Sequence, residues 1–355
     1  MPKTVTQGRF THRLRGVTNL LTTTFLVLGR RAIGKPLVKE WPAIFEMATL
    51  FWRKQFNHAF ALNNIADGRA YFDSVYSLPD VMPEVDVVPS GANQPAGDWF
   101  IPRKSSSDIT MLYFHGGGYS FYAKVSRLFI ALLAEWLGIR IFAPDYRLSP
   151  EHPHPAQLED GLAAYRFLLD QGIPPNKLVI CGDSAGGHLV LMTLVGARDA
   201  GFRQPALAVA LSPWTDTGFR GVSQFGNDVY DMVQGYMTIQ FSKWLKGDQP
   251  LSDQEVSPIY QSLHGLAPIY LQAGGKEILV DMIRDFAREV KGQGGAVRLD
   301  VWEHMTHEFH AYGDLIPESR QALNLIKQTI DCAVDAKTKG NLPRLPQTEI
   351  DCLGL

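Results

Sequence analysis

The chain has 355 residues, of which 45% are hydrophobic and 20% charged, and its formal net charge is −2. This composition is typical of globular proteins, and the length suffices for one large α/β domain with an appended cap or for two ordinary domains. The three cysteines, Cys181, Cys332 and Cys352, are too few and too scattered for a disulfide framework or a zinc site. We therefore expect a cytoplasmic location, where cysteines stay reduced.

The low net charge hides a basic N-terminal arm. Residues 1–39 contain eight Lys or Arg and no acid, which leaves 26 of the 34 bases against all 36 acids in the rest of the chain. One apolar helical face runs through this arm, formed by Leu14, Val17, Leu21, Phe25 and Leu28. We expect a helix that packs on the protein as part of a lid. Peripheral membrane contact through residues 1–39 and a targeting segment are the alternatives, because the apolar run is too short to span a bilayer.

A second amphipathic segment, residues 41–56, is expected to belong to the same cap. Its apolar side contains Trp41, Ile44, Phe45, Ala48, Phe51 and Trp52. Residues 1–85 are therefore predicted to form an N-terminal arm and cap helices.

From about residue 86 the pattern changes to short apolar strands that alternate with helical segments. The expected strands are residues 87–88, 99–102, 110–114, 140–143, 178–181, 207–211, 268–273 and 297–302. The expected helices are residues 128–136, 157–171, 189–195, 278–292 and 318–337. Such alternation predicts right-handed crossovers and a mainly parallel sheet with helices on both faces.

The alternation stops between residues 214 and 266, where aromatic residues and glycines are scattered through an irregular stretch. We interpret residues 214–266 as a cap insertion within one α/β domain that spans residues 86–340. The tail, residues 341–355, contains proline and is expected to be peripheral.

The segment Gly182-Asp183-Ser184-Ala185-Gly186 stands between an apolar strand and a helical run. A serine at the tip of such a tight turn adopts a strained backbone, and neighbouring chains pass close by, so small residues are needed two positions before it and two after. Gly182 and Gly186 fill those positions. This G-x-S-x-G elbow predicts that Ser184 is a nucleophile. The alternative interpretation is an ordinary Gly-Ser turn before a helix.

A serine hydroxyl needs a base, a carboxylate that orients the base, and backbone donors for the oxyanion. His115-Gly116-Gly117-Gly118 ends another strand and exposes amides without side chains. We expect the amides of Gly116, Gly117 and Ala185 to form the oxyanion hole. A phosphate-binding loop is the competing interpretation, but the spacing matches neither a Walker A motif nor G-x-G-x-x-G.

These motifs together resemble the hormone-sensitive lipase family of α/β-hydrolases. The resemblance covers about residues 85–335 and rests on H-G-G-G from His115, on D-Y-R-L-S-P-E from Asp145, on G-D-S-A-G from Gly182, and on the order serine, acid, histidine. It implies the α/β-hydrolase fold and a catalytic domain within residues 86–340. Asp145, Arg147 and Glu151 are expected to form a buried ionic network that braces the elbow.

The resemblance also implies the remaining catalytic groups. The segment from Glu303 to Phe309 is similar to the family's E-G-M-x-H-x-F loop, with His304 in place of the glycine, and it designates His307 as the base. His304 and His310 are the alternatives, and a metal cluster of these three histidines is a further one. The family pattern places Glu277 as the acid, where Asp is more common, with Asp281 as the fallback.

The expected activity is that of a serine carboxylesterase that cleaves small-molecule esters with short to medium acyl chains through an acyl-enzyme. No metal, organic cofactor or nucleic-acid partner is expected, and a homodimer is one of the options. The same groups would serve an amidase, thioesterase or lactonase. From a different class, the scaffold would suit a non-catalytic small-molecule receptor, such as the plant gibberellin receptors that resemble this family.

Overall fold

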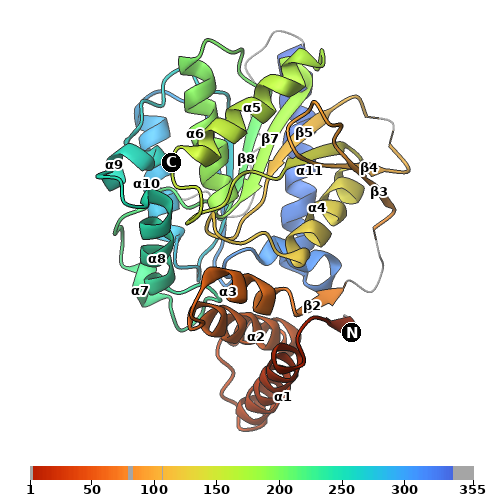
Figure 1. Ribbon diagram of the computed structural model, residues 1–355, viewed down its shortest axis with the longest axis vertical. Coiled ribbons are helices and arrows are strands. Elements are labelled where there is room, and N and C mark those ends of the chain that lie inside the picture. Colours follow the sequence, from red (N-terminus) through yellow and green to blue (C-terminus); the bar gives the residue numbers. More distant parts are fainter. Residues whose placement is uncertain (1–2, 79–82, 106, 339–355) are drawn as a thin grey trace.

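The computed structural model describes residues 3–78, 83–105 and 107–338 (Figure 1). The expected C-terminal tail, residues 341–355, lies outside the described residues.

An eight-stranded sheet forms the centre of the molecule, in the order β10-β9-β8-β7-β5-β6-β4-β3. Its strands are β3 (Val85–Pro89), β4 (Gly97–Pro102), β5 (Thr110–Phe114), β6 (Arg140–Pro144), β7 (Leu178–Asp183), β8 (Leu207–Leu211), β9 (Ile269–Gly274) and β10 (Val297–Trp302). The strands from β10 to β6 in this order are parallel, whereas β4 pairs antiparallel with both β6 and β3. The predicted mainly parallel sheet is confirmed.

Helices cover both faces of this sheet. On one face α4 (Lys124–Leu137) and α11 (Pro317–Thr338) contribute to one apolar core, and on the other α5 (Ala156–Asp170), α6 (Ala185–Asp199) and α10 (Val280–Gly292) contribute to a second. Every residue of β5, β7, β8 and β9 is buried, because strands covered on both faces meet no solvent. The continuous apolar runs in the sequence reflect this double burial.

The N-terminal region forms a cap at one end of the sheet (Figure 1). It contains α1 (Phe10–Ala32), α2 (Ala43–Phe60) and α3 (Ile65–Phe72), and the short strands β1 (Lys3–Thr6) and β2 (Val75–Leu78), which pair antiparallel. Asn64 caps α3 by accepting a hydrogen bond from the amide of Asp67 at 2.8 Å. Trp41 and Phe45 are fully buried in a cluster with the segment that follows β10, so the cap is anchored to the α/β domain.

The helix α1 packs on α2, as expected, but the apolar face from which that packing was inferred is exposed and the opposite face makes the contact. The exposed positions include Phe10, Leu14, Val17, Leu21, Phe25 and Leu28. The buried positions are His12, Gly16, Asn19, Thr23 and Val27. The reason is a polar network that spacing does not reveal: the Asn19 amide donates to Gln55 of α2 and to the hydroxyl of Tyr71 in α3, at 2.9 and 3.1 Å.

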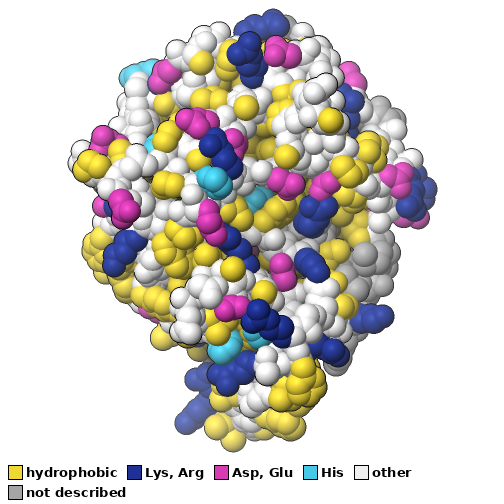
Figure 2. Space-filling view, in the orientation of Figure 1, with side chains coloured by type: hydrophobic (Ala, Val, Ile, Leu, Met, Phe, Trp, Pro, Cys, Tyr) yellow, Lys and Arg dark blue, Asp and Glu magenta, His cyan; other side chains and the backbone are white. Residues whose placement is uncertain are grey.

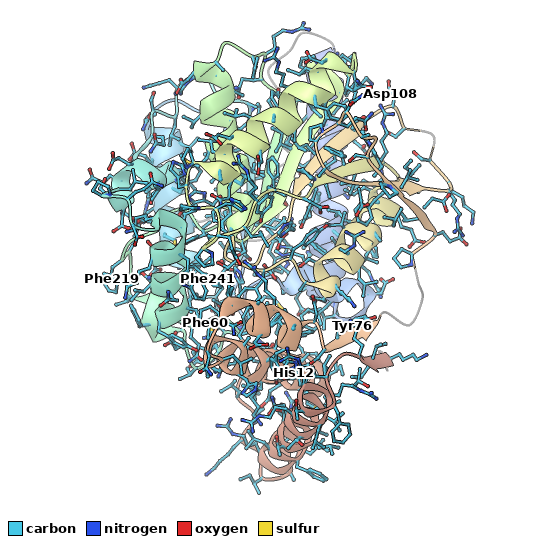
Figure 3. All side chains as sticks on the ribbon, viewed as in Figure 1. His12, Phe60, Tyr76, Asp108, Phe219 and Phe241 are labelled. Carbon is cyan, nitrogen blue, oxygen red and sulfur yellow. The ribbon has the colours of Figure 1, made fainter. Side chains whose placement is uncertain are left out.

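The irregular stretch 214–266 contains the short helices α7 (Ser223–Gly226), α8 (Gly235–Lys246) and α9 (Asp253–Val256) and the 3₁₀ turn η2 (Pro258–Tyr260). Two further 3₁₀ segments are η1 (Pro175–Lys177) and η3 (Phe309–Leu315). The insertion meets the N-terminal cap through aromatic side chains, among them Phe241 and Phe60, whose ring centroids lie 5.1 Å apart (Figure 3).

The expected buried ionic network of Asp145, Arg147 and Glu151 is also corrected. Arg147 is partly exposed and pairs with Glu159 and Asp160 of α5. Glu151 pairs with Arg69 of α3 through two hydrogen bonds of 2.7 and 2.8 Å, and so ties the cap to the α/β domain. The two arginines satisfy the acids near the surface, where the ions keep part of their hydration.

Candidate active site

Ser184 occupies a sharp turn between β7 and α6. Its backbone has φ 52° and ψ −117°, a region that a residue with a side chain seldom adopts. The turn is held by hydrogen bonds on both sides: the Ser184 amide donates to the Leu211 carbonyl at 2.9 Å, and the Ser184 carbonyl accepts from the Trp214 amide at 3.1 Å. The strained turn projects the serine from the end of a rigid strand.

Glycines flank Ser184 because no side chain fits there. A Cβ on Gly186 would lie 2.0 Å from the Phe114 carbonyl oxygen, and one on Gly182 would lie 2.6 Å from the backbone of Gly186. The β5 and β7 backbones therefore approach the start of α6 closely. This is the close packing that the elbow motif predicts.

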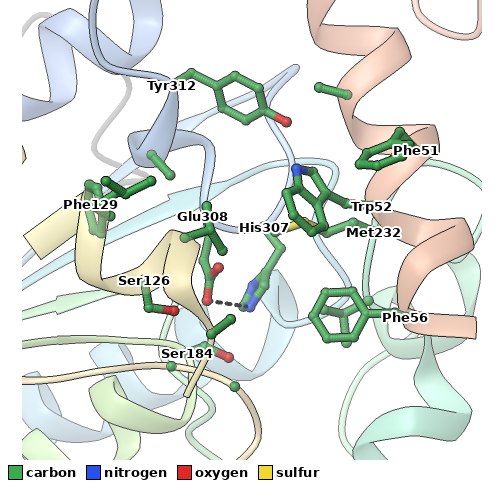
Figure 4. Close-up of a pocket in the computed structure, with 18 of the residues that line it drawn as sticks. Phe51, Trp52, Phe56, Ser126, Phe129, Ser184, Met232, His307, Glu308 and Tyr312 are labelled. Carbon is green, nitrogen blue, oxygen red and sulfur yellow. Dashed lines mark ion pairs between the residues drawn. The ribbon is translucent and has the colours of Figure 1, made fainter. Parts of the chain in front are cut away.

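An apolar cavity of about 920 Å³ lies over the serine. Its wall includes Ser184 and His307, which are labelled in Figure 4, and also the consecutive Gly116, Gly117 and Gly118. The H-G-G-G loop, the elbow and the histidine loop, which are far apart in sequence, thus meet at one cavity. The rest of its wall is mainly hydrophobic and comes from the cap, the insertion and α4. The cap residues include Leu20, Leu21, Ile44, Met47, Phe51, Trp52, Phe56 and Phe72.

The backbone amides of the three glycines differ in their hydrogen bonding and conformation. The Gly116 amide donates to the buried carboxylate of Asp183, so this N–H already has an acceptor, contrary to the role expected for it. Gly117 and Gly118 have φ values of 108° and 60°, which favour glycine. A Cβ on Gly118 would lie 2.3 Å from the Phe241 ring. Ala185 is the first residue of α6, and the first amides of a helix have no intrahelical acceptor.

His307 follows β10 and is almost fully buried. Burial lowers the pKa of its imidazole from 6.5 to about 3, so the neutral form, which is able to accept a proton, prevails near neutral pH. Its Nδ1 has no hydrogen-bond partner among the described residues. His304 and His310 do not line the cavity, and among the described residues no cluster of His, Cys, Asp or Glu is arranged to hold a metal ion.

Glu277 lies in the loop after β9 and is fully buried. Its Oε2 accepts hydrogen bonds from the Ser212 hydroxyl at 2.7 Å and from the Gly274 amide at 2.8 Å, while Oε1 has no partner among the described residues. Burial, which outweighs these hydrogen bonds, raises the pKa of Glu277 to about 8. The loop is joined to the histidine loop, because the Lys276 amide donates to the Met305 carbonyl at 2.8 Å.

Asp281, the fallback acid, is engaged elsewhere. It lies in the first turn of α10, where its carboxylate accepts a hydrogen bond from the Ser223 amide at 2.9 Å and faces Arg284 at 3.6 Å. These contacts direct it toward the insertion. Asp281 does not line the cavity, and its carboxylate already has partners.

Sequence reasoning missed a second carboxyl group at this site, that of Glu308. Its Oε1 lies 3.6 Å from Nε2 of His307, as Figure 4 shows, and its side chain hydrogen-bonds to Asp183, which also accepts from the Tyr113 hydroxyl at 2.5 Å. Burial, followed by the nearby Asp183 carboxylate, raises the pKa of Glu308 well above its ordinary value. A proton on one of the two carboxyl groups would make this contact a hydrogen bond. The sequence signal that could have indicated Glu308 is its position directly after His307.

Comparisons with known proteins agree with this architecture. A family model described as alpha/beta hydrolase fold matches residues 111–311. An acetyl-hydrolase of Streptomyces hygroscopicus is 34% identical over 247 residues, which cover 69% of this chain and 81% of that protein. An esterase of Acinetobacter venetianus is 29% identical over 225 residues, 62% of this chain and 74% of that protein.

Solved structures are similar over a larger part of the chain. The crystal structure of an esterase from the bacterial hormone-sensitive lipase family superposes with a TM-score of 0.72 at 32% identity, and it covers 80% of this chain and 97% of that one. The residues matched by the family model, 111–311, include the serine elbow and the histidine loop. The chain therefore belongs to the hormone-sensitive lipase family of the α/β-hydrolases.

Proposed function

We propose that the protein hydrolyses carboxylic esters with Ser184 as the nucleophile. The observation that carries this proposal is the cavity wall itself, which brings the strained serine, a buried neutral histidine and glycine amides to one apolar space. Esterases and an acetyl-hydrolase among the relatives support the same reaction.

The reaction begins when Ser184 attacks the acyl carbon and His307 accepts its proton. The negative oxygen of the tetrahedral intermediate is held by the amides of Gly117, Gly118 and Ala185, since the Gly116 amide is bound to Asp183. His307 then protonates the leaving alcohol. Water attacks the resulting acyl-enzyme by the same steps in reverse and releases the acid.

Glu277 orients the histidine in this proposal. The unpartnered Oε1 of Glu277 and the unpartnered Nδ1 of His307 are complementary, and they belong to loops that hydrogen-bond to each other. A hydrogen bond between them would fix the tautomer whose Nε2 is free to accept the serine proton. The imidazolium formed during attack would favour the ionised carboxylate, against the effect of burial.

The substrates we propose are uncharged esters with short to medium acyl chains, because most of the cavity wall is apolar. The enzyme is expected to work in the cytoplasm and to reach membrane surfaces through residues 1–39. Among the helices of the described residues, none combines the length and hydropathy that a transmembrane span requires. A homodimer stays a prediction.

Replacement of Ser184 by Ala tests the nucleophile. We expect hydrolysis of p-nitrophenyl butyrate to fall by about 10⁴-fold or more, with an unchanged melting temperature. Ser126→Ala, at a second serine on the cavity wall, is the matched control and should keep most of the activity. Undiminished turnover by the Ser184 variant would contradict the proposal.

A further inference from the structure

The outer face of α1 is an exposed apolar stripe. We define it as Phe10, Leu14, Val17, Leu21, Phe25 and Leu28, whose side chains are 39% to 74% exposed. The residues follow spacings of three and four over 19 positions, so they form one continuous row along the helix. A row of this kind on a surface helix usually contacts another body, such as a protein or a membrane.

The inner face fixes this orientation. Gly16 contacts β2 so closely that a Cβ there would lie 2.2 Å from Cγ2 of Val75. Asn19 donates to Gln55 and Tyr71, whose hydroxyl also donates to Gln55 at 2.7 Å. Rotation of the helix to bury its apolar row would break this buried network and leave its polar groups unpaired. The outer face is therefore held outward.

The charged residues of the arm that carries the outer face are all basic. The arm carries eight bases and no acid, whereas the rest of the chain has ten more acids than bases. Arg9 and Arg31 pair with Asp67 and Glu46, but Arg13 and Arg15, beside the row, have no acidic partner among the described residues. Figure 2 shows Lys and Arg beside hydrophobic side chains at the lower end of the molecule, where α1 lies.

We propose that the outer face of α1 docks on an anionic lipid surface, so that the cavity above Ser184 opens toward the bilayer. Apolar residues flanked by cations are the pattern of an interfacial helix, which buries one face at the boundary of headgroups and acyl chains. A second copy fits less well, because a symmetric contact through α1 would bring two wholly basic arms together. The rest of the chain is net negative and is repelled by an anionic surface, so the basic arm turns toward that surface.

The polar residues near the row are compatible with that environment. The hydroxyls of Thr18, Thr22 and Thr24 donate to backbone carbonyls four residues earlier, at 2.8 to 2.9 Å. Hydroxyls that are satisfied within the helix lose no partner when water is replaced by lipid.

The cavity is continuous with this face. Leu21 belongs to the row, is about half exposed, and also lines the cavity together with Leu20 and Thr24. From there the wall passes along α2 to the serine, as Figure 4 shows for Phe51, Trp52 and Phe56. An ester dissolved in the bilayer would enter the cavity without crossing water. This use of the cavity rests on the proposed ester hydrolysis, whereas docking does not.

Vesicle flotation tests the docking directly. The full chain is mixed with vesicles of phosphatidylcholine alone or with phosphatidylglycerol added. We expect binding to the anionic vesicles, reduced by salt, and at least about tenfold weaker for the double variant Leu14→Glu/Phe25→Glu. Phe219→Glu/Val222→Glu, at an equally exposed apolar site on the insertion, is the control and should bind like the unaltered protein.

Activity measurements then separate docking from catalysis. Both double variants should hydrolyse soluble p-nitrophenyl acetate at the unaltered rate, because none of these four residues lines the cavity. Only Leu14→Glu/Phe25→Glu should lose hydrolysis of p-nitrophenyl decanoate held in anionic vesicles, again by about tenfold. Ser184→Ala should bind vesicles and hydrolyse neither ester.

Three results would overturn the docking proposal: no binding of the unaltered protein to anionic vesicles, equal loss of binding in both double variants, or a dimer that only Leu14→Glu/Phe25→Glu dissociates, without vesicle binding. A protein that binds vesicles and hydrolyses no ester would keep the docking and refute the proposed function.

Discussion

Ser184 shows how one residue's conformation depends on its neighbours. Its positive φ is maintained because β7 and α6 fix both ends of the turn and because glycines remove the side chains that would collide with β5. The energetic cost of such strain, about 1–3 kcal/mol, is offset by the packing of the elements on either side. The pentapeptide made this residue predictable, since the spacing of glycines follows directly from the close approach.

Two substitutions test whether Glu277 or Asp281 is the acid that orients His307. We expect Glu277→Gln to lower kcat for p-nitrophenyl butyrate by about 10²–10⁴-fold, because a neutral amide can neither hold the imidazole in the required tautomer nor stabilise the imidazolium. Asp281→Asn should have little effect, since that carboxylate contacts Ser223 and Arg284. The reverse order of effects would make Asp281 the acid.

Other features of the site could not be predicted from residue patterns. The sequence placed Gly116 in the oxyanion hole, but the amide of Gly116 binds Asp183, a contact that depends on how β5 and β7 pair. Glu308 was overlooked because its meeting with Asp183 joins residues 125 positions apart in the chain. Motifs indicate candidate reactive groups, whereas the hydrogen bonds that occupy or free those groups depend on the tertiary fold.

Among the elements, the helix α1 shows that the spacing of apolar residues predicts a helix but does not say which of its faces contacts the protein. The spacing of apolar residues correctly predicted a helix, but the face in contact with the protein is the one with glycine and polar residues. The usual interpretation of an amphipathic helix is that its apolar face is buried against the protein. A membrane-facing helix reverses that assumption, and only the partners of Asn19 in α2 and α3 reveal the reversal.

Two glycines of α1 should respond oppositely to the same substitution. Gly16→Ala should destabilise the protein by about 1–3 kcal/mol, because the added Cβ would lie 2.2 Å from Val75. Gly29→Ala should stabilise it by about 0.5–1 kcal/mol, since nothing lies within 4 Å of its Cβ position and alanine favours helix. Urea unfolding measures both. A Gly16 variant as stable as the Gly29 variant would contradict the packing of α1.

At the scale of the whole molecule, buried ionisable groups control the pH range of stability. Burial lowers the pKa to about 3 for four histidines, His115, His188, His307 and His310. Burial raises the pKa of Asp231 to about 7 and that of Glu277 to about 8.

The lowered histidine pKa values and the raised carboxyl pKa values have opposite effects on how stability changes with pH. The unfolded chain binds protons at the histidines below about pH 6.5 and the folded chain does not, so the histidine contribution to stability is lost as the pH falls. The folded chain keeps the carboxyl protons up to about pH 7–8, so the carboxyl contribution is lost as the pH rises above about 4. Above about pH 6.5 only the carboxyl contribution still changes, so we expect the melting temperature to fall between about pH 6.5 and 8. Below about pH 4 only the histidine contribution still changes, so we expect the melting temperature to fall there as well. Calorimetry that showed a steady rise from pH 5 to 9 would contradict this balance.

Much of the molecular architecture followed from the sequence, because strands buried on both faces are continuous apolar runs and their alternation with helices restricts the topology. The sequence did not predict the antiparallel direction of β3 and β4 at one edge or the short helices of the insertion, since an apolar run indicates a strand without giving its direction. The meeting of three loops at one cavity is a property of the parallel sheet, whose strands end at the same edge.

Labelling by a fluorophosphonate tests whether Ser184 is an activated nucleophile, because the probe reacts with a serine only where a base and oxyanion donors activate it. Mass spectrometry of the digested protein should locate one equivalent of label on Ser184, with loss of esterase activity in proportion, and His307→Ala should abolish the labelling. Label on another residue, or an unlabelled protein that still hydrolyses esters, would contradict the account.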